Sequence, residues 1–300
     1  MTPSGGRALV VAGPWAWLAV FVLAPLAIVT KISLSETASA QPPYRPLLPS
    51  SLDSEAWRAF AEALGLESYR TLLSDDLYWQ SALSSLAVAA GSTALLILLG
   101  YPIALAMARA PRGWRPVLAA LVILPFWTSF LIRIYAWIAI LKPDGLLNAA
   151  LLALGLVDAP LSILGTDGAV VLGIAYGYLP FMVLPLYAVL DRRDPTLIEA
   201  AADLGATPWA TFRTITLPLS ASGLAAGCLL CFIPIFGEFI IPDLLGGSDT
   251  LMLGRTLWSE FFANRDWPLA SAVAIVMLAA LTVPLLLASR LEDRRAEARR

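Results

Sequence analysis

Long runs of apolar residues, separated by shorter polar segments, dominate the pattern of this chain. A helix needs about twenty consecutive apolar residues to cross the hydrocarbon core of a bilayer. Six runs come close to this length, at residues 9–30, 81–108, 117–141, 168–190, 222–242 and 268–289. The pattern therefore predicts an all-α, polytopic membrane protein with six transmembrane helices, embedded in a lipid bilayer.

The first apolar run has an alternative interpretation as a signal peptide, because Ala38-Ser39-Ala40 resembles a cleavage site. The run is long for the apolar part of a signal peptide, and the polar residues 31–37 separate it from that site. We therefore expect a retained span. Residues 31–80 then form a long external loop, in which D-S-E-A-W-R-A-F-A-E-A-L at 53–64 predicts a short helix. We expect residues 1–300 to form one integral-membrane domain.

Basic residues gather on one side of this topology. Because Lys and Arg are enriched in cytoplasmic segments, the richer side predicts the cytoplasm. With the N-terminus inside, the cytoplasmic side holds twelve basic residues: Arg7, Arg109, Arg112, Arg115, Arg192, Arg193, Arg213, Arg290, Arg294, Arg295, Arg299 and Arg300. The other side holds seven: Lys31, Arg45, Arg58, Arg70, Lys142, Arg255 and Arg265. Both termini are therefore expected in the cytoplasm.

Composition supports the membrane class and argues against catalysis. Hydrophobic residues make up 59% of the chain and charged residues only 14%, far from the balance of a soluble domain. The chain has no histidine and no phosphate-binding G-x-x-x-x-G-K-[ST] segment. Its two cysteines, Cys228 and Cys231, lie within an apolar run, where packing is a more frequent role than redox chemistry. We expect no enzymatic activity, cofactor, metal site or nucleic-acid partner.

A polar segment at 194–220, within the wider stretch 191–221, interrupts the apolar pattern. Asp194 before Pro195 predicts a capped helix start, and Gly205 predicts its end at a left-handed residue. Thr207 before Pro208 predicts a second start. The second helix would carry Trp209, Phe212 and Ile215 on one side and end at Pro218. The sequence thus predicts two short helices joined by a turn.

The spacing of this segment resembles the coupling motif of ABC-importer permease subunits. The matching positions are Glu199-Ala200-Ala201, then Gly205, Ile215 and Leu217-Pro218. The alternative is an ordinary amphipathic linker. In the family that the chain resembles, this segment inserts into a cleft of an ATPase and passes its movement to the membrane helices. The resemblance implies a type I ABC-importer permease fold, with these ATPase-coupling residues: Glu199, Ala200, Ala201, Gly205, Ala206 and Phe212.

Two ionisable residues lie at membrane depth, where charge is costly and is usually functional or paired. Arg133 falls within the third predicted span and Glu238 within the fifth. Pro234, Gly237 and Pro242 predict a break around Glu238, and no other span shows such a break. Broken helices are tolerated where they line a cavity. The sequence therefore leaves two interpretations open: both charges belong to a substrate path, or they neutralise each other or a partner's charge.

Further stretches resemble polyamine-importer permeases for putrescine and spermidine, and most closely the putrescine type with a long first external loop. They are L-P-F-W-T-S-F-L-I-R-I-Y-A-W at 124–137, P-F-M-V-L-P at 180–185, G-E-F-I-I-P-D-L-L-G-G at 237–247 and F-F-A-N-R-D-W-P-L-A-S-A at 261–272. Asp243 departs from the glutamate expected there, which leaves the substrate range open. The residues expected along the path are Glu238, Arg133, Trp127, Tyr135 and Asp243. Aromatic residues near span ends are also common interfacial anchors.

The resemblance implies an assembly as well as a fold. It implies five core spans with a peripheral first span, a second homologous permease subunit, an ATP-binding-cassette ATPase dimer and an extracytoplasmic substrate-binding protein. The expected function is import of a small organic cation across a bacterial inner membrane. The alternatives are the same machine with another substrate, such as an opine or other small solute, and an ion-coupled secondary transporter. A membrane scaffold or receptor would need neither Arg133 nor Glu238 at depth.

Overall fold

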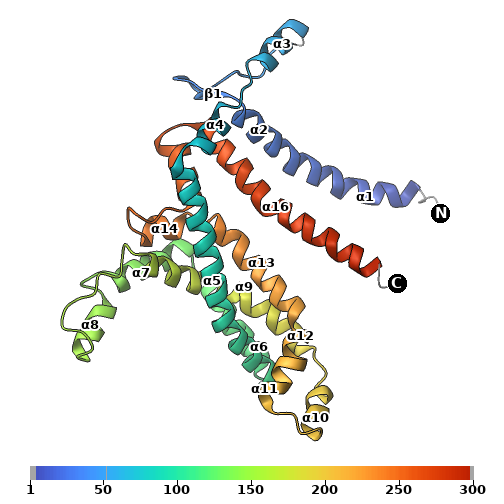
Figure 1. Ribbon diagram of the computed structural model, residues 1–300, viewed down its shortest axis with the longest axis vertical. Coiled ribbons are helices and arrows are strands. Elements are labelled where there is room, and N and C mark those ends of the chain that lie inside the picture. The colour runs from blue at the N-terminus through green and yellow to red at the C-terminus, as the bar shows by residue number, and fades with distance from the viewer. Residues whose placement is uncertain (1–4, 52, 298–300) are drawn as a thin grey trace. The chain divides into compact units, whose positions relative to one another are not determined.

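The computed structural model describes residues 5–51 and 53–297, and most of these residues are helical (Figure 1). The strands of this described part form a two-stranded antiparallel ribbon of β1 (Glu36–Thr37) and β2 (Tyr44–Arg45). Two compact units emerge, one of Met1–Trp79 with Thr256–Arg300 and one of Gln80–Arg255. The predicted all-α class is confirmed, whereas the apolar pattern did not predict the ribbon.

The first unit pairs the beginning and the end of the chain. Its elements are α1 (Gly5–Leu18), the π-helical η1 (Ala19–Leu23), α2 (Ala24–Ser33), α3 (Ser54–Glu62), α4 (Glu67–Ser74), the π-helical η4 (Ser259–Ala263) and α16 (Trp267–Glu297). α16 packs against α2 and α4 (Figure 1). The short helix predicted at 53–64 is confirmed as α3, and the Asp53 carboxylate accepts a hydrogen bond from the Glu55 amide at 3.3 Å. Tyr78 donates to the buried Glu260 at 3.0 Å.

The second unit holds most of α5 (Asp76–Arg109) and the segments between it and Arg255. They are α6 (Arg115–Ile123), the 3-10 helix η2 (Leu124–Trp127), α7 (Phe130–Leu141), α8 (Leu146–Ala153), α9 (Asp167–Asp191), α10 (Thr196–Asp203), α11 (Pro208–Thr211), the π-helical η3 (Phe212–Thr216), α12 (Leu217–Leu219), α13 (Ala221–Phe236) and α14 (Ile240–Leu245). The short α15 (Leu253–Trp258) begins here and runs into the first unit.

α9 is the central helix of this unit, and it packs against α13, α14, α7 and α6. Small residues permit the close approach of these helices, as is common between membrane helices. A Cβ added at Gly173 would lie 2.6 Å from Leu245 Cδ1, and one added at Gly227 would lie 2.9 Å from Met182 Sδ. A side chain at either glycine would therefore force the neighbouring Leu245 or Met182 side chain to shift.

Each predicted span falls on an apolar helix or on a bent pair of helices. Three helices are long and apolar enough to span alone: Val11–Ser33, Asp76–Arg109 and Asp167–Asp191. Two bent pairs qualify together, Arg115–Trp127 with Phe130–Ala153 and Pro208–Leu219 with Ala221–Phe236. Trp267–Val283 is a shorter apolar helix. Only 11% of the first apolar stretch is buried, against 56% for α9.

The third predicted span is not one helix, so the expectation that only the fifth span is broken was wrong. The two halves of residues 117–141 meet at an angle of 86°. Pro125 lies in the 3-10 turn before the bend, and Thr128 and Ser129 have extended backbone with ψ of 152° and 135°. Since proline lacks an amide hydrogen, the helical hydrogen bonds weaken at this point and the chain can turn.

The fifth predicted span breaks near Glu238, as its sequence indicates. α13 ends at Phe236 and α14 begins at Ile240, which leaves Gly237, Glu238 and Phe239 outside both helices. Pro234 does not cause the break directly, because it lies inside α13. The break leaves backbone amides at the start of α14 without helical partners, and these amides donate hydrogen bonds to Glu238.

Candidate coupling segment and translocation path

The coupling segment, residues 194–220, begins with a locally capped helix. The Asp194 carboxylate accepts a hydrogen bond from the Thr196 amide at 3.0 Å. This bond lowers the pKa of the exposed Asp194 carboxyl below its usual value. α10 begins at Thr196, one residue later than the capping pattern predicts. The second start is also capped, because the Thr207 hydroxyl accepts from the Ala210 amide at 3.3 Å.

Gly205 ends α10 with a φ of +74°, which confirms its predicted left-handed conformation. Around it, the Ala206 amide donates to the Ala201 carbonyl and the Gly205 amide to the Ala202 carbonyl, both at 2.9 Å. These two bonds form a Schellman motif, which satisfies the last carbonyls of the helix. A Cβ added at Gly205 would meet no atom within 4 Å, so the need for glycine here is conformational and not steric.

The face of the segment is apolar and exposed. Leu204 is 88% exposed and Trp209 is 70% exposed, while Glu199 and Ala200 lie on the surface and Ala201 is buried. Large apolar side chains exposed together on a short turn usually mark an interaction surface. The arrangement is suited to docking against another protein.

The second part of the segment is less regular than predicted. α11 passes into the wider turn of η3, and Pro218 lies inside α12 instead of ending it. Proline is tolerated there because it occupies the beginning of the short helix, where its missing amide costs little. The turn comes two residues later at Ser220, and the helices on either side meet at 65°.

Contacts with the scaffold hold this second part. The Phe212 ring stacks on Trp209 at 5.4 Å and meets the edge of Tyr101, in α5, at 5.5 Å. The Tyr101 hydroxyl lies 2.7 Å from the hydroxyl of the fully buried Ser220. These side-chain contacts connect the coupling segment directly to α5.

Glu238 is a buried carboxylate at the start of α14. Its Oε1 accepts hydrogen bonds from the amides of Phe239, Ile240 and Ile241 at 3.1, 3.0 and 3.4 Å. Its Oε2 accepts from the Tyr178 hydroxyl at 2.5 Å. A negative charge at a helix N-terminus is stabilised by the free amides and by the helix dipole. The structure thus gives Glu238 a capping role beside any role toward a ligand.

Arg133 lies in α7 against aromatic rings. Its Cζ is 5.1 Å from the centre of the Phe126 ring and 5.5 Å from that of Phe130. Its Nε and Nη1 are buried without a hydrogen-bond partner, and in the described chain it forms no ion pair. Contact with the ring faces compensates part of the cost of burial. Arg133 and Glu238 therefore do not neutralise each other within this chain.

Aromatic rings connect the surroundings of these two charges. Phe126 contacts Phe181 edge to face at 5.1 Å, and Phe181 lies 6.0 Å from Tyr178, the partner of Glu238. The structure thus brings Glu238 together with Tyr178 and brings Arg133 together with Phe126 and Phe130. The sequence did not indicate that Tyr178 contacts Glu238.

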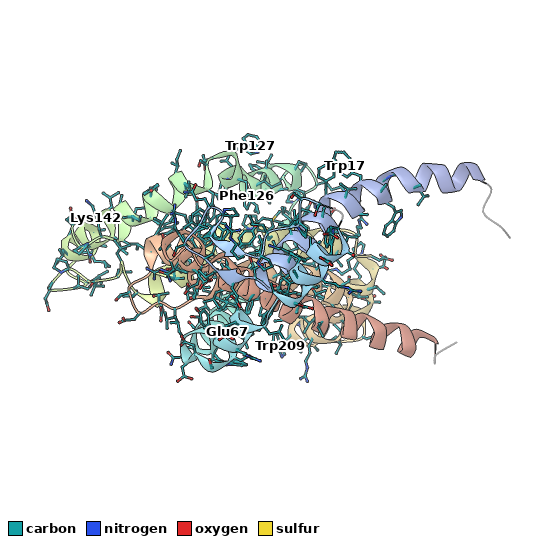
Figure 2. All side chains as sticks on the ribbon, turned by 90° about the horizontal axis from the view of Figure 1, so that it is seen from above. Trp17, Glu67, Phe126, Trp127, Lys142 and Trp209 are labelled. Atoms are coloured by element: carbon teal, nitrogen blue, oxygen red, sulfur yellow. The ribbon has the colours of Figure 1, made fainter. Side chains whose placement is uncertain are left out.

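The other expected path residues lie apart from this cluster. Trp127 projects from the ribbon (Figure 2) and is 79% exposed. Tyr135 is 58% exposed. Asp243 in α14 pairs with Arg255 at 3.3 Å, and half of its side chain is exposed. None of the three contacts Glu238 directly in the hydrogen bonds and ion pairs of the described residues.

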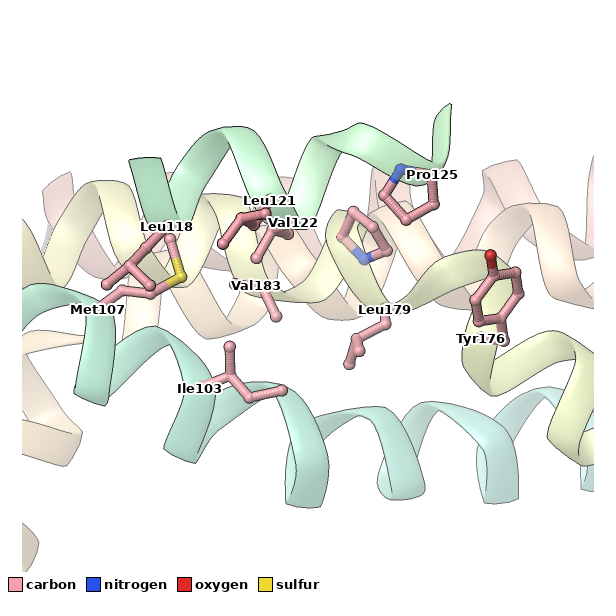
Figure 3. Close-up of a pocket in the computed structure, with 10 residues that line it drawn as sticks. Ile103, Met107, Leu118, Leu121, Val122, Pro125, Tyr176, Leu179 and Val183 are labelled. Carbon is pink, nitrogen blue, oxygen red and sulfur yellow. The ribbon is translucent and has the colours of Figure 1, made fainter. Parts of the chain in front are cut away.

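An apolar cavity of about 300 Å³ lies between α5, α6 and α9 (Figure 3). Its lining residues are Ile103, Met107, Leu118, Leu121, Val122, Pro125, Tyr176, Leu179, Pro180 and Val183. This lining holds no charged group, so it does not stabilise an ammonium ion. A cationic ligand is better served by the aromatic and carboxylate cluster.

Comparison with known proteins decides what kind of protein carries these features. The family model described as "Binding-protein-dependent transport system inner membrane component" matches residues 9–297, nearly the whole chain. The chain belongs to this family. It is therefore a transport permease and not an enzyme, and a multi-pass protein of the inner membrane.

Two relatives within this permease family are similar along most of their length. The spermidine/putrescine transport system permease protein PotB of Haemophilus influenzae is 38% identical over 286 residues, covering 94% of each chain. The protein of the same name from Escherichia coli is 43% identical over 235 residues, covering 77% of this chain and 85% of the relative. The predicted resemblance to polyamine permeases is confirmed.

A solved structure shares the fold of this permease. It is a bacterial alginate ABC transporter in complex with an alginate pentasaccharide-bound periplasmic protein. The TM-score is 0.65 at 17% identity, and the match covers 96% of this chain and 94% of the other. The predicted ABC-importer permease fold is confirmed. The family match also argues against an ion-coupled secondary transporter. The number of broken spans does not distinguish the two classes.

Proposed function

We propose that this permease is the membrane-spanning subunit of an ABC importer that carries spermidine or putrescine into the cytoplasm. The main support for this proposal is the 38% identity, over 94% of both chains, to a protein named a spermidine/putrescine transport system permease. Similarity that extends over the whole chain includes the segments that would surround the substrate, and not only the coupling motif. The chain lacks a phosphate-binding motif, so ATP hydrolysis belongs to a partner.

The proposed assembly has four kinds of component. Two copies of an ATPase bind on the cytoplasmic side, a second homologous permease subunit completes the path, and an extracytoplasmic binding protein delivers the polyamine. The distribution of basic residues supports an orientation with both termini in the cytoplasm. This orientation is tested by labelling a cysteine introduced at Ala206, in a background without Cys228 and Cys231. We expect no reaction with an impermeant thiol reagent applied outside, and a reaction there would contradict the orientation.

The coupling segment is the proposed ATPase contact. Glu199, Ala200 and Ala201 approach the ATPase surface, Gly205 and Ala206 shape the turn, and Phe212 passes the movement on. Support comes from the exposed Leu204 and Trp209 and from the contacts that fix Phe212 to Tyr101. A rigid segment transmits a displacement that a flexible loop would absorb.

The substrate is proposed to pass close to Glu238, along a path to which Arg133, Trp127, Tyr135 and Asp243 contribute from this subunit. An ammonium group that approaches Glu238 can replace the Tyr178 hydroxyl at Oε2, while Oε1 keeps its amide bonds. The rings of Tyr178 and Phe181 favour a cation without binding it tightly. One carboxylate that already has partners suits a transient site, because a fully unpaired acid would hinder release.

The deciding experiment is uptake of radiolabelled spermidine and putrescine. The chain would be expressed with its partner subunits in cells lacking their own polyamine importers. We expect saturable uptake that requires a hydrolysis-competent ATPase and is not abolished by a protonophore in ATP-replete vesicles. Unlabelled spermidine and putrescine should compete, whereas an opine should not. Competition by the opine alone would overturn the polyamine assignment and leave the importer assignment in place.

A further inference from the structure

A concave pocket of about 440 Å³ lies where α5, α6 and α9 end or begin, beside α10. Its lining residues are Ala108, Arg109, Arg112, Arg115, Leu190, Asp191, Arg193, Pro195, Ile198 and Glu199. All of them belong to the second unit. Four guanidinium groups therefore face two carboxylates, which leaves an excess of positive charge in a hollow of ligand size.

Two of the four arginines already have partners. Arg115 contacts Asp191 through Nη1 at 2.6 Å and donates through Nε to the Ala110 carbonyl at 2.9 Å. Arg193 donates through Nη1 to Thr216 Oγ1 at 3.0 Å. Arg109 and Arg112 form no side-chain hydrogen bond or ion pair with the residues that the structure describes. They remain available to a ligand.

The positive charges are crowded, and within the described residues only Arg115 of the four pairs with a carboxylate. Burial lowers the pKa of Arg193, and the proximity of Arg109 lowers it further. Two cations held close together repel each other unless an anion lies between them. An anion in the pocket would relieve this repulsion, so the site favours negative ligands on charge alone.

The chemistry of the free groups narrows the class of anion. Guanidinium groups bind phosphate through paired hydrogen bonds, and several arginines can share the oxygens of one phosphate. We propose that this pocket binds a phosphate group, carried by an anionic phospholipid headgroup or by a soluble phosphate compound. Its position fits the first source, because Arg109 and Asp191 are the last residues of two apolar helices long enough to span a membrane. Phospholipid phosphates lie at this depth.

The site also has a route to the coupling segment. Arg193, which lines the pocket, donates a hydrogen bond to Thr216 near the end of the coupling segment. Glu199, in the first helix of the coupling segment, also lines the pocket. A bound phosphate would hold these two parts together through Arg193. Occupancy would thereby set how firmly the segment is positioned for its partner. This consequence rests on the proposed function of the segment, whereas phosphate binding itself does not.

Binding can be measured on the purified full-length chain without ATPase or substrate. One arm reconstitutes it in phosphatidylcholine nanodiscs with increasing phosphatidylglycerol and counts retained phosphatidylglycerol by native mass spectrometry. The other arm adds inorganic phosphate or pyrophosphate to phosphatidylcholine nanodiscs and measures binding by isothermal titration calorimetry. Retention of phosphatidylglycerol supports the headgroup as source, and binding of the soluble anions supports a free phosphate compound. Binding of neither at 50 mM salt overturns the proposal.

Variants separate this pocket from general positive charge. We expect Arg109→Gln and Arg112→Gln each to weaken binding about tenfold, since each removes charge-assisted hydrogen bonds. Arg112→Lys keeps the charge but loses the paired geometry, so we expect an intermediate loss. Arg213→Gln is the matched control. Arg213 is exposed and belongs to the predicted cytoplasmic segment 191–221, but it does not line the pocket. It should bind like the parent chain, and an equal loss in this control would overturn the proposal.

Discussion

Replacement of Glu238 tests which interaction stabilises this carboxylate: its hydrogen bonds to Tyr178 and the α14 amides, or an ionic interaction with Arg133. Glu238→Gln keeps the shape and one acceptor oxygen but removes the charge from four hydrogen bonds. Hydrogen bonds to charged groups contribute about 1.5–3 kcal/mol and neutral ones about 0.5–1.5 kcal/mol. Since the capping geometry can survive in part, we expect a loss of about 1–3 kcal/mol in the free energy of unfolding.

Double-mutant cycles then locate the partner. Tyr178→Phe removes only the hydroxyl that donates to Glu238, so its effect should depend strongly on the residue at 238. We expect a coupling energy of about 1 kcal/mol or more between Glu238→Gln and Tyr178→Phe. Between Glu238→Gln and Arg133→Gln we expect less than about 0.5 kcal/mol, because the two side chains share no contact in the described chain.

The assay is equilibrium unfolding of each single and double variant in mixed micelles. Asp243→Asn is the control, because Asp243 is a carboxylate inside α14, the helix whose first amides bind Glu238, and its half-exposed pair with Arg255 should contribute no more than about 1 kcal/mol. If Glu238 coupled more strongly to Arg133 than to Tyr178, our account of the break would be wrong. In that case transport should also recover in the double Gln variant, whereas we expect no recovery.

Three further predictions address other parts of the second unit. Gly205→Val should leave the chain folded but reduce ATPase stimulation in the reconstituted importer, and Gly205→Asn should retain more of it because asparagine tolerates the left-handed region; equal stimulation in both would contradict this. Gly227→Ala should destabilise by about 1–3 kcal/mol in a thermal unfolding assay, because its Cβ would lie 3.2 Å from the Met182 carbonyl, whereas Gly91→Ala meets no neighbour and should not. The lowered pKa of Asp194 predicts that its contribution is present above pH 3.8 and is lost as the pH falls further; hydrogen exchange at the first amide of α10 should show this loss, and Asp194→Asn should abolish it.

Local chemistry made the coupling segment predictable. The caps at Asp194 and Thr207 and the left-handed Gly205 depend on residues within a few positions, so their spacing in the sequence carries the information. The apolar length of each span is likewise a property of consecutive residues, so the sequence carries it too. The assignment of the coupling residues to an ATPase contact remains a prediction.

The bend in the third span could not be predicted, because proline alone does not decide whether a helix breaks. α9 contains Pro180 and Pro185 and continues through both, whereas the chain turns after Pro125. The difference depends on neighbouring helices, which supply or withhold partners for the released carbonyls. The environment of Glu238 was hidden for the same reason, since Tyr178 lies sixty residues earlier in the chain.

The contacts that fix the coupling segment to the rest of the unit lie in its second part, through Phe212 and Ser220 with Tyr101 and Thr216 with Arg193, while Leu204 in the preceding turn faces outward. The outward face can therefore change by mutation while the supports stay constant. This separation makes the outward part of the segment portable: exchanging residues 194–210 between two permeases, which leaves Phe212, Thr216 and Ser220 in place, should exchange their ATPase preferences without refolding either protein. Lineages could acquire new ATPase partners in the same way, by substitutions confined to one exposed turn.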